Sequence, residues 1–252
     1  MRSPFRSIVL FAAGLGLAGP VTAQVVSGGP LDTGLDWTRA SRFELGIGAT
    51  YAQAAHEFSR YVDHGWGANV SGTFRLDRRG VLGIRGDAAL MEYGSETKRV
   101  PLSPTVNRVL VDMTTSNNIG VISIGPELRL PVGPVRPFVN AAIALAIFTT
   151  GTSVGGSDNG NETNDFASSK NYSDETRAYR LGGGLYLPFG RGGWNGGITL
   201  GAAYYAGGKA SYLQEGGIKD NANGTITLTP IRSRTEFWSY DIGMRVVLPK
   251  GD

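Results

Sequence analysis

Residues 65–90 read GWGANVSGTFRLDRRGVLGIRGDAAL, and alternate positions of this stretch differ in polarity. On each side of the DRRG turn at 77–80, one set of positions is mostly apolar, and the other carries glycine, polar or charged residues. Alternation of this kind in two runs around a tight turn predicts two antiparallel strands, each with two unlike faces. Which face meets the protein interior decides between a soluble barrel and a membrane barrel.

The same alternation recurs along the rest of the chain. Six further segments show it: 43–52, 120–131, 138–148, 179–189, 196–207 and 237–248. The connections alternate between tight turns (77–80, 132–136, 190–195) and longer stretches, roughly 53–64, 95–117, 150–176 and 208–234. This pattern predicts an all-β fold, an eight-stranded antiparallel up-and-down barrel whose long loops share one end.

The composition of the two faces favours a barrel that crosses a membrane. The polar set is mostly Gly, Ala, Ser and Thr with about one or two charges per strand, which is sparse for a surface in water. The apolar set is nearly free of charge in all eight segments, as a lipid-facing surface must be, since one Arg or Lys at the bilayer midplane costs about 2–4 kcal/mol. We therefore expect transmembrane strands with the apolar face outward, short periplasmic turns and long extracellular loops.

The overall composition excludes several kinds of protein. The chain has 252 residues, no cysteine and a formal net charge of +3. Without cysteine there is no disulfide framework, no thiolate metal site and no lipoprotein anchor. The Lys and Arg residues are scattered and form no basic stripe interleaved with aromatic residues, so a nucleic-acid partner is not expected.

The N-terminus reads as a targeting segment. Arg2 and Arg6 precede a short apolar run, and Val21, Thr22 and Ala23 provide small residues before a cut at Gln24. This arrangement is typical of a secretory signal peptide. We expect a signal peptide at 1–23, an N-terminal lead at 24–41 and a barrel domain at 42–252.

Charged residues on the polar face are expected to pair in the lumen, because buried charges require partners. The lumen charge network predicted from the alternation comprises Glu44, Arg75, Arg85, Asp87, Glu127, Arg129, Arg180, Asp241 and Arg245. An eight-stranded barrel has an interior just wide enough for side chains to fill. We favour a filled lumen over a polar conduit, and a narrow low-conductance channel is the alternative.

Aromatic residues lie near the ends of the segments on the apolar face. Those toward the long-loop end are Tyr51, Trp66, Tyr204, Trp238 and Tyr240, with Phe43, Phe74 and Phe189 toward the other rim. Aromatic girdles of this kind sit at lipid headgroups. The sequence therefore predicts interface anchors at both rims.

On this pattern the chain resembles the small eight-stranded bacterial outer-membrane barrels over about residues 42–248. Its end also resembles the C-terminal assembly signal of that class, which Asp241, Gly243, Val246 and Leu248 match. The resemblance implies a location in the outer membrane, with outer-membrane lipid, lipopolysaccharide and the barrel-assembly machinery as partners. It raises three functions, namely a structural or surface-binding barrel, a narrow channel and a lipid-modifying enzyme.

The enzyme reading has little support in the residues. Some barrels of this kind act on lipid A with a His, a Ser and an acidic residue near the outer rim. The two histidines here are His56 and His64, with Ser59 and Asp63 between them. No motif of a known acyl-transfer site is present, so we predict no enzymatic activity and no catalytic residues.

Neither a cofactor nor a metal is expected. The segments 157–165 and 219–224 cluster oxygen ligands, but neither has the spacing of an EF-hand loop. Weak calcium binding there stays an open alternative. The long loops are the expected functional surface, because loops on a rigid scaffold usually carry binding, and the sequence names no extracellular ligand. A soluble periplasmic barrel that holds an apolar ligand is the remaining alternative.

Overall fold

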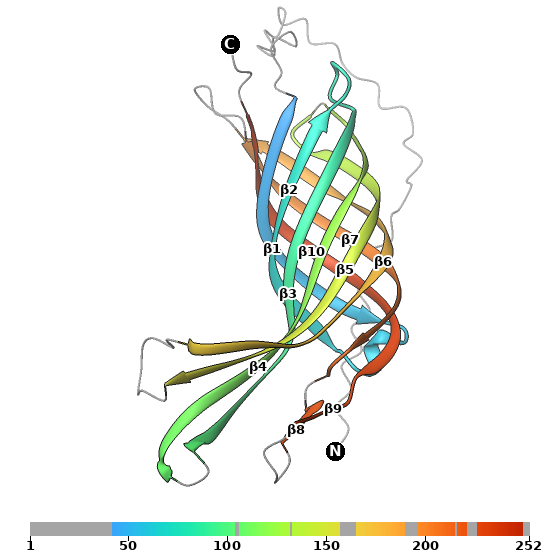
Figure 1. Ribbon diagram of the computed structural model, residues 1–252. Helices are drawn as coiled ribbons and strands as arrows, with labels where there is room; N and C mark the ends of the chain where they lie inside the picture. The colour runs from blue at the N-terminus through green and yellow to red at the C-terminus, as the bar shows by residue number, and fades with distance from the viewer. Residues whose placement is uncertain are drawn as a thin grey trace, which may run out of the picture. The chain divides into compact units, whose positions relative to one another are not determined.

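A closed antiparallel barrel forms the body of the protein. The computed structural model describes residues 42–103, 106–131, 133–156, 165–189, 196–214, 216–220 and 226–248. Eight strands pair around the ring in the order β1-β10-β7-β6-β5-β4-β3-β2, so that each wall strand neighbours the one before it and the one after it in the chain (Figure 1). The predicted all-β, eight-stranded antiparallel up-and-down barrel is confirmed.

The wall consists of eight strands, and the remaining elements are short. The wall strands are β1 (Phe43–Ala55), β2 (His64–Arg75), β3 (Leu82–Ser103), β4 (Val106–Arg129), β5 (Arg136–Gly156), β6 (Asp165–Phe189), β7 (Gly196–Tyr212) and β10 (Ile231–Val247). A 3-10 turn, η1 (Phe58–Arg60), follows β1, and β8 (Ile218–Asp220) pairs with β9 (Ile226–Leu228) in a separate small sheet.

Closure of the ring is made by the first and last strands. β1 and β10 pair from Glu44 opposite Val247 to Ala55 opposite Glu236. The backbone N–H of Leu248 adds a hydrogen bond to the carbonyl of Phe43 at 2.9 Å. Closure removes the free edges that an open sheet would present, and a barrel in lipid requires this.

Four wall strands are longer than the alternation predicts. β3, β4, β5 and β6 contain 22, 24, 21 and 25 residues, and they pair through much of the segments 95–117 and 150–176 that the sequence pattern assigns to loops. The pairing there is supported by polar cross-strand contacts, such as Arg99 to Asp112 at 3.0 Å and the Thr97 and Thr114 hydroxyls at 3.0 Å. Such pairs stabilise a sheet without apolar alternation, so periodicity does not reveal these strands.

The segment 225–231, TITLTPI, alternates in the sequence, and this alternation predicts an extension of the last hairpin. Its β9 portion pairs with β8, with Ile218 opposite Leu228, and not with a wall strand. β10 begins at Ile231, the last residue of this segment, and pairs with β7. The extension is therefore a small hairpin of its own.

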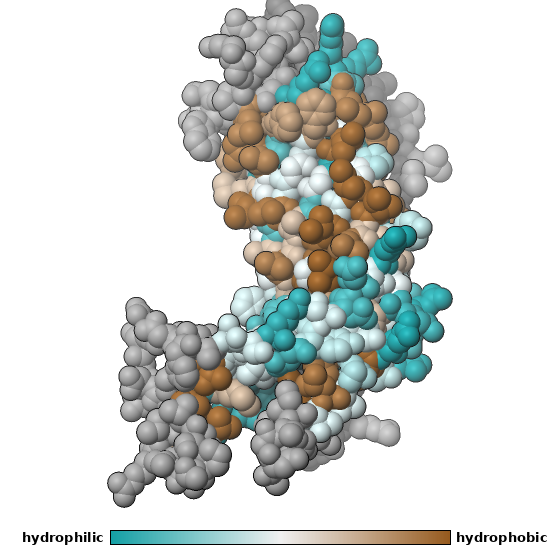
Figure 2. Space-filling model, in the orientation of Figure 1, coloured by the Kyte–Doolittle hydropathy of each residue, from teal (hydrophilic) through white to brown (hydrophobic). Residues whose placement is uncertain are grey.

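The apolar face of the wall points outward. Ile47, Leu90, Ile143 and Leu181 are 64–72% exposed, although all four lie within the paired wall. Figure 2 shows hydrophobic side chains spread over the barrel wall, with hydrophilic ones toward both of its ends. The barrel is thus the reverse of a soluble one, whose apolar face fills the interior.

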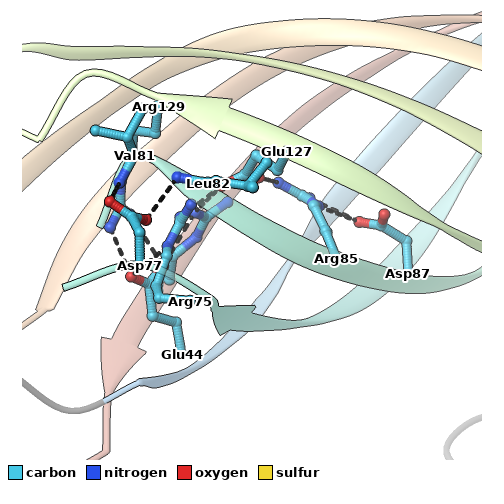
Figure 3. Close-up of polar contacts among 10 residues, drawn as sticks. Glu44, Arg75, Asp77, Val81, Leu82, Arg85, Asp87, Glu127 and Arg129 are labelled. Carbon is cyan, nitrogen blue, oxygen red and sulfur yellow. Dashed lines mark hydrogen bonds and ion pairs between the residues drawn. The ribbon is translucent and has the colours of Figure 1, made fainter. Parts of the chain in front are cut away.

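The β2–β3 turn shows how a tight turn at the short-loop end is fixed. The Asp77 carboxylate accepts hydrogen bonds from the backbone N–H groups of Arg79, Val81 and Leu82 at 3.1, 3.2 and 2.8 Å. Asp77, Val81 and Leu82 are labelled in Figure 3. Gly80 has a φ of 70°, which glycine adopts without steric cost. Slight burial raises the pKa of Asp77. The backbone N–H donors lower it by more, because they stabilise the carboxylate, so the net pKa lies below its usual range.

The predicted signal peptide (1–23) and lead (24–41) lie outside the described residues. The boundaries predicted for them therefore stay predictions. Within the described residues no helix is long and apolar enough to span a membrane, a finding that has no bearing on strands.

Close approach of strands makes one glycine of the wall difficult to replace. A Cβ atom at Gly184 would lie 2.0 Å from the carbonyl oxygen of Leu200, whereas one at its cross-strand partner Gly201 would meet no atom closer than 3.7 Å. We expect Gly184→Ala to destabilise the barrel by about 1–3 kcal/mol through overpacking. Urea unfolding in detergent micelles measures this change.

Gly201→Ala is the matched control, because it also adds one methyl group to an inward position of the same strand pair. Equal urea midpoints for the two variants would contradict the close approach of β6 and β7.

Candidate functional site

The lumen at the short-turn end is filled by ionic side chains. Glu44 on β1 is 3% exposed, and it forms ion pairs with three arginines from three other strands. Its carboxylate lies 3.1 Å from Arg75, 2.6 Å from Arg129 and 3.3 Å from Arg245. A carboxylate can accept bidentate hydrogen bonds from a guanidinium, and both Arg75 and Arg129 use two nitrogens on Glu44.

Glu127 on β4 is the second acidic centre of this layer and is fully buried. It lies 2.5 Å from Arg75, 3.0 Å from Arg85 and 3.3 Å from Arg245. Arg75 and Arg245 therefore bridge Glu44 and Glu127 (Arg75, Arg85 and both carboxylates are labelled in Figure 3). The two glutamates and four arginines form one connected network across strands β1, β2, β3, β4 and β10.

Aromatic rings of β5 and β6 pack against the arginines. The Arg129 guanidinium lies 5.0 Å from the ring centroid of Tyr186, and Arg245 lies 5.4 Å from Phe138. Cation–π contacts of this kind stabilise cations that have left water. Neither ring is recognisable from the sequence as part of the network, although both stand at positions of β5 and β6 that share the parity of the polar face.

A second ion pair cluster lies on the next level of the lumen. Arg85 also contacts Asp87 at 2.7 Å, and Arg180 lies 3.7 Å from the same carboxylate. Arg180 donates to the Tyr205 hydroxyl at 2.9 Å and to the Asn140 side-chain oxygen. Eight of the nine predicted network residues are thus joined to one another by ion pairs.

The ninth, Asp241, is held by hydrogen bonds and not by an ion pair among the described contacts. Its carboxylate accepts from the Thr50 hydroxyl and from the Asn69 amide, the latter at 3.1 Å. A cavity of about 20 Å³ lies at this level, which is room for about one water molecule.

Toward the long-loop end, the lumen is closed by apolar and aromatic side chains that the sequence analysis did not anticipate. Phe58 of η1 is 1% exposed and packs edge-on against Tyr93, Phe148 and Tyr212, with centroid distances of 6.5, 5.9 and 5.2 Å. Val62 of the same loop is also buried. In the sequence, two large apolar residues four positions apart in an otherwise polar loop, Phe58 and Val62, were the available indication that this loop packs into the barrel.

The predicted outer-rim aromatics lie on the outward face. Trp66 is 68% exposed, and Tyr51, Trp238 and Tyr240 are about equally exposed at 44–45%. Tyr51 lies opposite both Trp66 and Tyr240 in the strand register, and Tyr204 lies opposite Trp238. At the other rim Phe43 packs on Phe74 with ring centroids 5.0 Å apart. Their role as membrane anchors stays a prediction.

The residues of the predicted assembly signal occupy the end of β10. Asp241 points into the lumen, and Leu248 is exposed on the outer surface. A Cβ atom at Gly243 would lie 2.5 Å from the carbonyl of Ile47, so the signal's glycine sits where β1 and β10 close the ring. Val246 pairs with Leu45 at the same seam. Recognition by an assembly machinery stays a prediction.

The histidines are not arranged with Ser59 as a hydrolytic set. The Ser59 hydroxyl donates to the backbone carbonyl of His56 at 2.9 Å, and the His56 imidazole lies 3.7 Å from Glu236. His64 stacks on Tyr51. Across the described part of the chain, no three His, Asp or Glu side chains are placed to hold a metal ion. Most of the two acidic segments, 157–164 and 221–224, lies outside it.

Site and fold together define an eight-stranded barrel with an ionic interior and an apolar exterior. The chain is similar in structure to Neisserial surface protein A, at 15% identity and a TM-score of 0.45 over 83% of this chain and 99% of that one. It is also similar to the outer membrane protein OprG from Pseudomonas aeruginosa, at 11% identity and a TM-score of 0.45 over 84% and 98%.

A third similar structure is Ail of Yersinia pestis, at 11% identity and a TM-score of 0.40 over 82% of this chain and 98% of that one. No protein-family model and no curated protein matches the sequence.

Glu127 offers a direct test of the ionic layer. Replacement by Gln removes the charge that faces Arg75, Arg85 and Arg245 while keeping the side-chain volume. Breaking a buried ion pair from one side typically costs about 3–5 kcal/mol, so we expect a loss of this size in the free energy of unfolding. Urea titration of the detergent-refolded protein measures it.

Glu175→Gln on the exposed surface of β6 is the control, with an expected change within about 0.5 kcal/mol. If Glu127→Gln is as stable as this control, the arginines do not depend on Glu127.

Proposed function

We propose that this chain is a β-barrel of a bacterial outer membrane with a structural or surface-binding role. Its lumen is filled by paired charges, and its outer wall faces lipid. Outer-membrane lipid and lipopolysaccharide are its surroundings, and the C-terminal segment 241–248 is the signal read by the barrel-assembly machinery. No enzymatic activity and no cofactor are part of this proposal.

The uninterrupted apolar exterior is the observation that carries the proposal. Outward positions from Phe43 to Tyr51 on β1, from Tyr179 to Phe189 on β6 and from Trp238 to Leu248 on β10 contain no Asp, Glu, Lys or Arg. Monomeric soluble proteins rarely expose contiguous apolar patches larger than a few hundred Å², and this surface continues around the whole ring. Hydrocarbon is the environment in which such a surface is stable.

The packed interior favours a structural or surface-binding barrel over the alternative of a narrow channel. Glu127 and Arg245 are at most 1% exposed at one end, and Phe58 and Tyr212 are equally buried at the other. Ions would have to displace two layers of packed side chains. The outward apolar face also argues against the soluble periplasmic barrel, because the inside holds ion pairs where an apolar ligand would have to bind.

The surface for binding lies beyond the outer rim. There β3–β6 extend as paired strands with mixed polar side chains, and β8 and β9 form an additional hairpin. Segments at the edge of a rigid scaffold commonly carry recognition. Among the described residues, no set of side chains on these extensions identifies an extracellular ligand.

Heat modifiability is the first experiment. The mature protein, extracted with detergent from outer-membrane fractions, should migrate as a compact form without boiling and shift on boiling, because a closed barrel resists detergent until heated. Solubility without detergent together with an unchanged mobility would overturn the membrane assignment.

A substitution on the outer wall tests the lipid-facing surface directly. Ile47 is 66% exposed and lies midway between the rim residues Phe43 and Tyr51. We expect Ile47→Arg to destabilise the barrel in lipid vesicles by about 2–4 kcal/mol. Ser169→Arg, at an exposed position on the polar extension of β6, is the control and should change stability by at most about 0.5 kcal/mol. Equal effects of the two variants would argue against a lipid-facing wall.

Planar-bilayer recording separates the structural role from the channel. The purified barrel should insert without producing discrete conductance steps, because both lumen layers are packed. Reproducible steps from the wild-type protein, retained after removal of contaminating porins, would favour the channel instead.

A further inference from the structure

The aromatic residues of the outer rim are confined to one side of the barrel. On the outward faces of β2, β1, β10 and β7 they form a strip, which we call the aromatic strip: Trp66, Tyr51, Tyr240, Trp238 and Tyr204. Neighbouring rings lie close together, with centroids 6.3 Å apart for Tyr51 and Tyr240 and 5.1 Å apart for Tyr204 and Trp238.

Tyr179 of β6, which is 74% exposed, continues the outward aromatic residues on the strand next to Tyr204, whereas outward positions of β3, β4 and β5 carry Leu90, Ile122 and Ile143. From Trp66 the strand register passes through Glu92, Asn118, Thr149 and Ser173, each paired across the sheet with the one before. A girdle that only anchors a barrel at the headgroup level has no reason to occupy one side alone. The strip therefore has the distribution of a binding surface.

A β-bulge places basic side chains next to the strip. Ala203, Tyr205 and Gly207 of β7 are buried, and after the bulge Ala210 and Tyr212 are buried instead. This change of parity turns Lys209 outward, directly opposite Arg234 of β10. Bulges commonly re-aim a side chain near functional sites. Two cations thus face each other across neighbouring strands, an arrangement that is unfavourable unless an anion binds there.

The acidic groups nearby are engaged. Glu236 accepts a hydrogen bond from the Tyr204 hydroxyl at 3.1 Å and lies 3.7 Å from His56 and 3.8 Å from Arg234. Glu57 accepts the backbone N–H of Arg234 at 3.2 Å. In the described part of the chain, no ion pair involves Lys209, and that of Arg234 is long and exposed.

Arg232 and Arg177 extend the basic group, and both are exposed. Arg232 stands two residues from Arg234 on the same face of β10, opposite Ser211. Asp174 of β6 accepts the backbone N–H of Ser211 at 2.7 Å and lies near Arg232, whose charge it partly offsets, so Lys209 and Arg234 carry the anion site with Arg232 beside them. Arg and Lys are the side chains that bind phosphate oxygens.

We propose that Lys209, Arg232, Arg234 and the adjoining aromatic strip form a binding site for a phosphorylated glycolipid of the outer leaflet. Its phosphate lies against the basic residues, and its sugar rings lie on Tyr204 and Trp238. The strip crosses three strand spacings, about 14 Å, which suits two or more linked sugar rings better than a single phospholipid headgroup. This inference rests on the proposed outer-membrane location.

The test uses the full mature chain in detergent and measures bound lipid by native mass spectrometry. The probes are lipid A with both phosphates, lipid A after phosphatase treatment, and phosphatidylglycerol. The variant is Lys209→Gln with Arg234→Gln, and the control is Lys98→Gln with Arg99→Gln on the extension of β3. Each basic residue near a membrane surface contributes about 1 kcal/mol toward anionic lipid, so the double variant should bind phosphorylated lipid A about thirtyfold more weakly.

The wild type should prefer the phosphorylated lipid A to both other probes, and the control should bind as the wild type does. Trp238→Leu should weaken binding of both forms of lipid A, while Phe189→Leu at the opposite rim should not. Equal binding of phosphatidylglycerol and lipid A would overturn the glycolipid assignment, and unchanged binding by the Lys209/Arg234 variant would overturn the site.

Heat modifiability of the same preparations distinguishes the two proposals. A mobility shift on boiling without lipid A binding refutes only the glycolipid site. Absence of both the shift and detergent dependence refutes the outer-membrane location on which the site rests.

Discussion

Charge pairing inside a narrow closed wall is the constraint on which the rest of the structure depends. Eight strands enclose a space that side chains almost fill, so an arginine that enters it leaves water and must find its counter-charge within the lumen. Glu44 and Glu127 meet this requirement for Arg75, Arg85, Arg129 and Arg245. The network links strands far apart in the sequence, and it holds these charged side chains inside the lumen and away from the apolar outer wall.

The two ends of the lumen are closed by different chemistry. At the short-turn end the filling is ionic, with Tyr186 and Phe138 against the guanidinium groups. At the long-loop end it is aromatic, and part of it comes from the first loop, whose η1 turn inserts Phe58 among Tyr93, Phe148 and Tyr212. A loop that packs into the barrel in this way closes the mouth, and the barrel's surface and strand extensions become the places where binding can occur.

The outer rim is asymmetric in two respects. The strands β3–β6 continue past the barrel as a paired sheet, while β7, β10, β1 and β2 carry the aromatic strip. A single β-bulge in β7 adds Lys209 beside Arg234 on the second side. One half of the rim therefore presents polar, backbone-paired strands, and the other presents aromatic rings and cations.

The sequence by itself determined the barrel, the number of wall strands, the outward direction of the apolar face and the set of charged residues that meet inside, because alternation with a period of two is a local property of each strand. It did not reveal the upper parts of β3–β6, where polar cross-strand pairs such as Thr97 with Thr114 replace apolar alternation. Nor did it reveal which carboxylate receives which arginine, the insertion of Phe58 or the outward turn of Lys209. Those features depend on the register between strands and on a bulge, and only the closed tertiary structure decides them, because closure brings residues from distant strands to one level of the lumen or the rim.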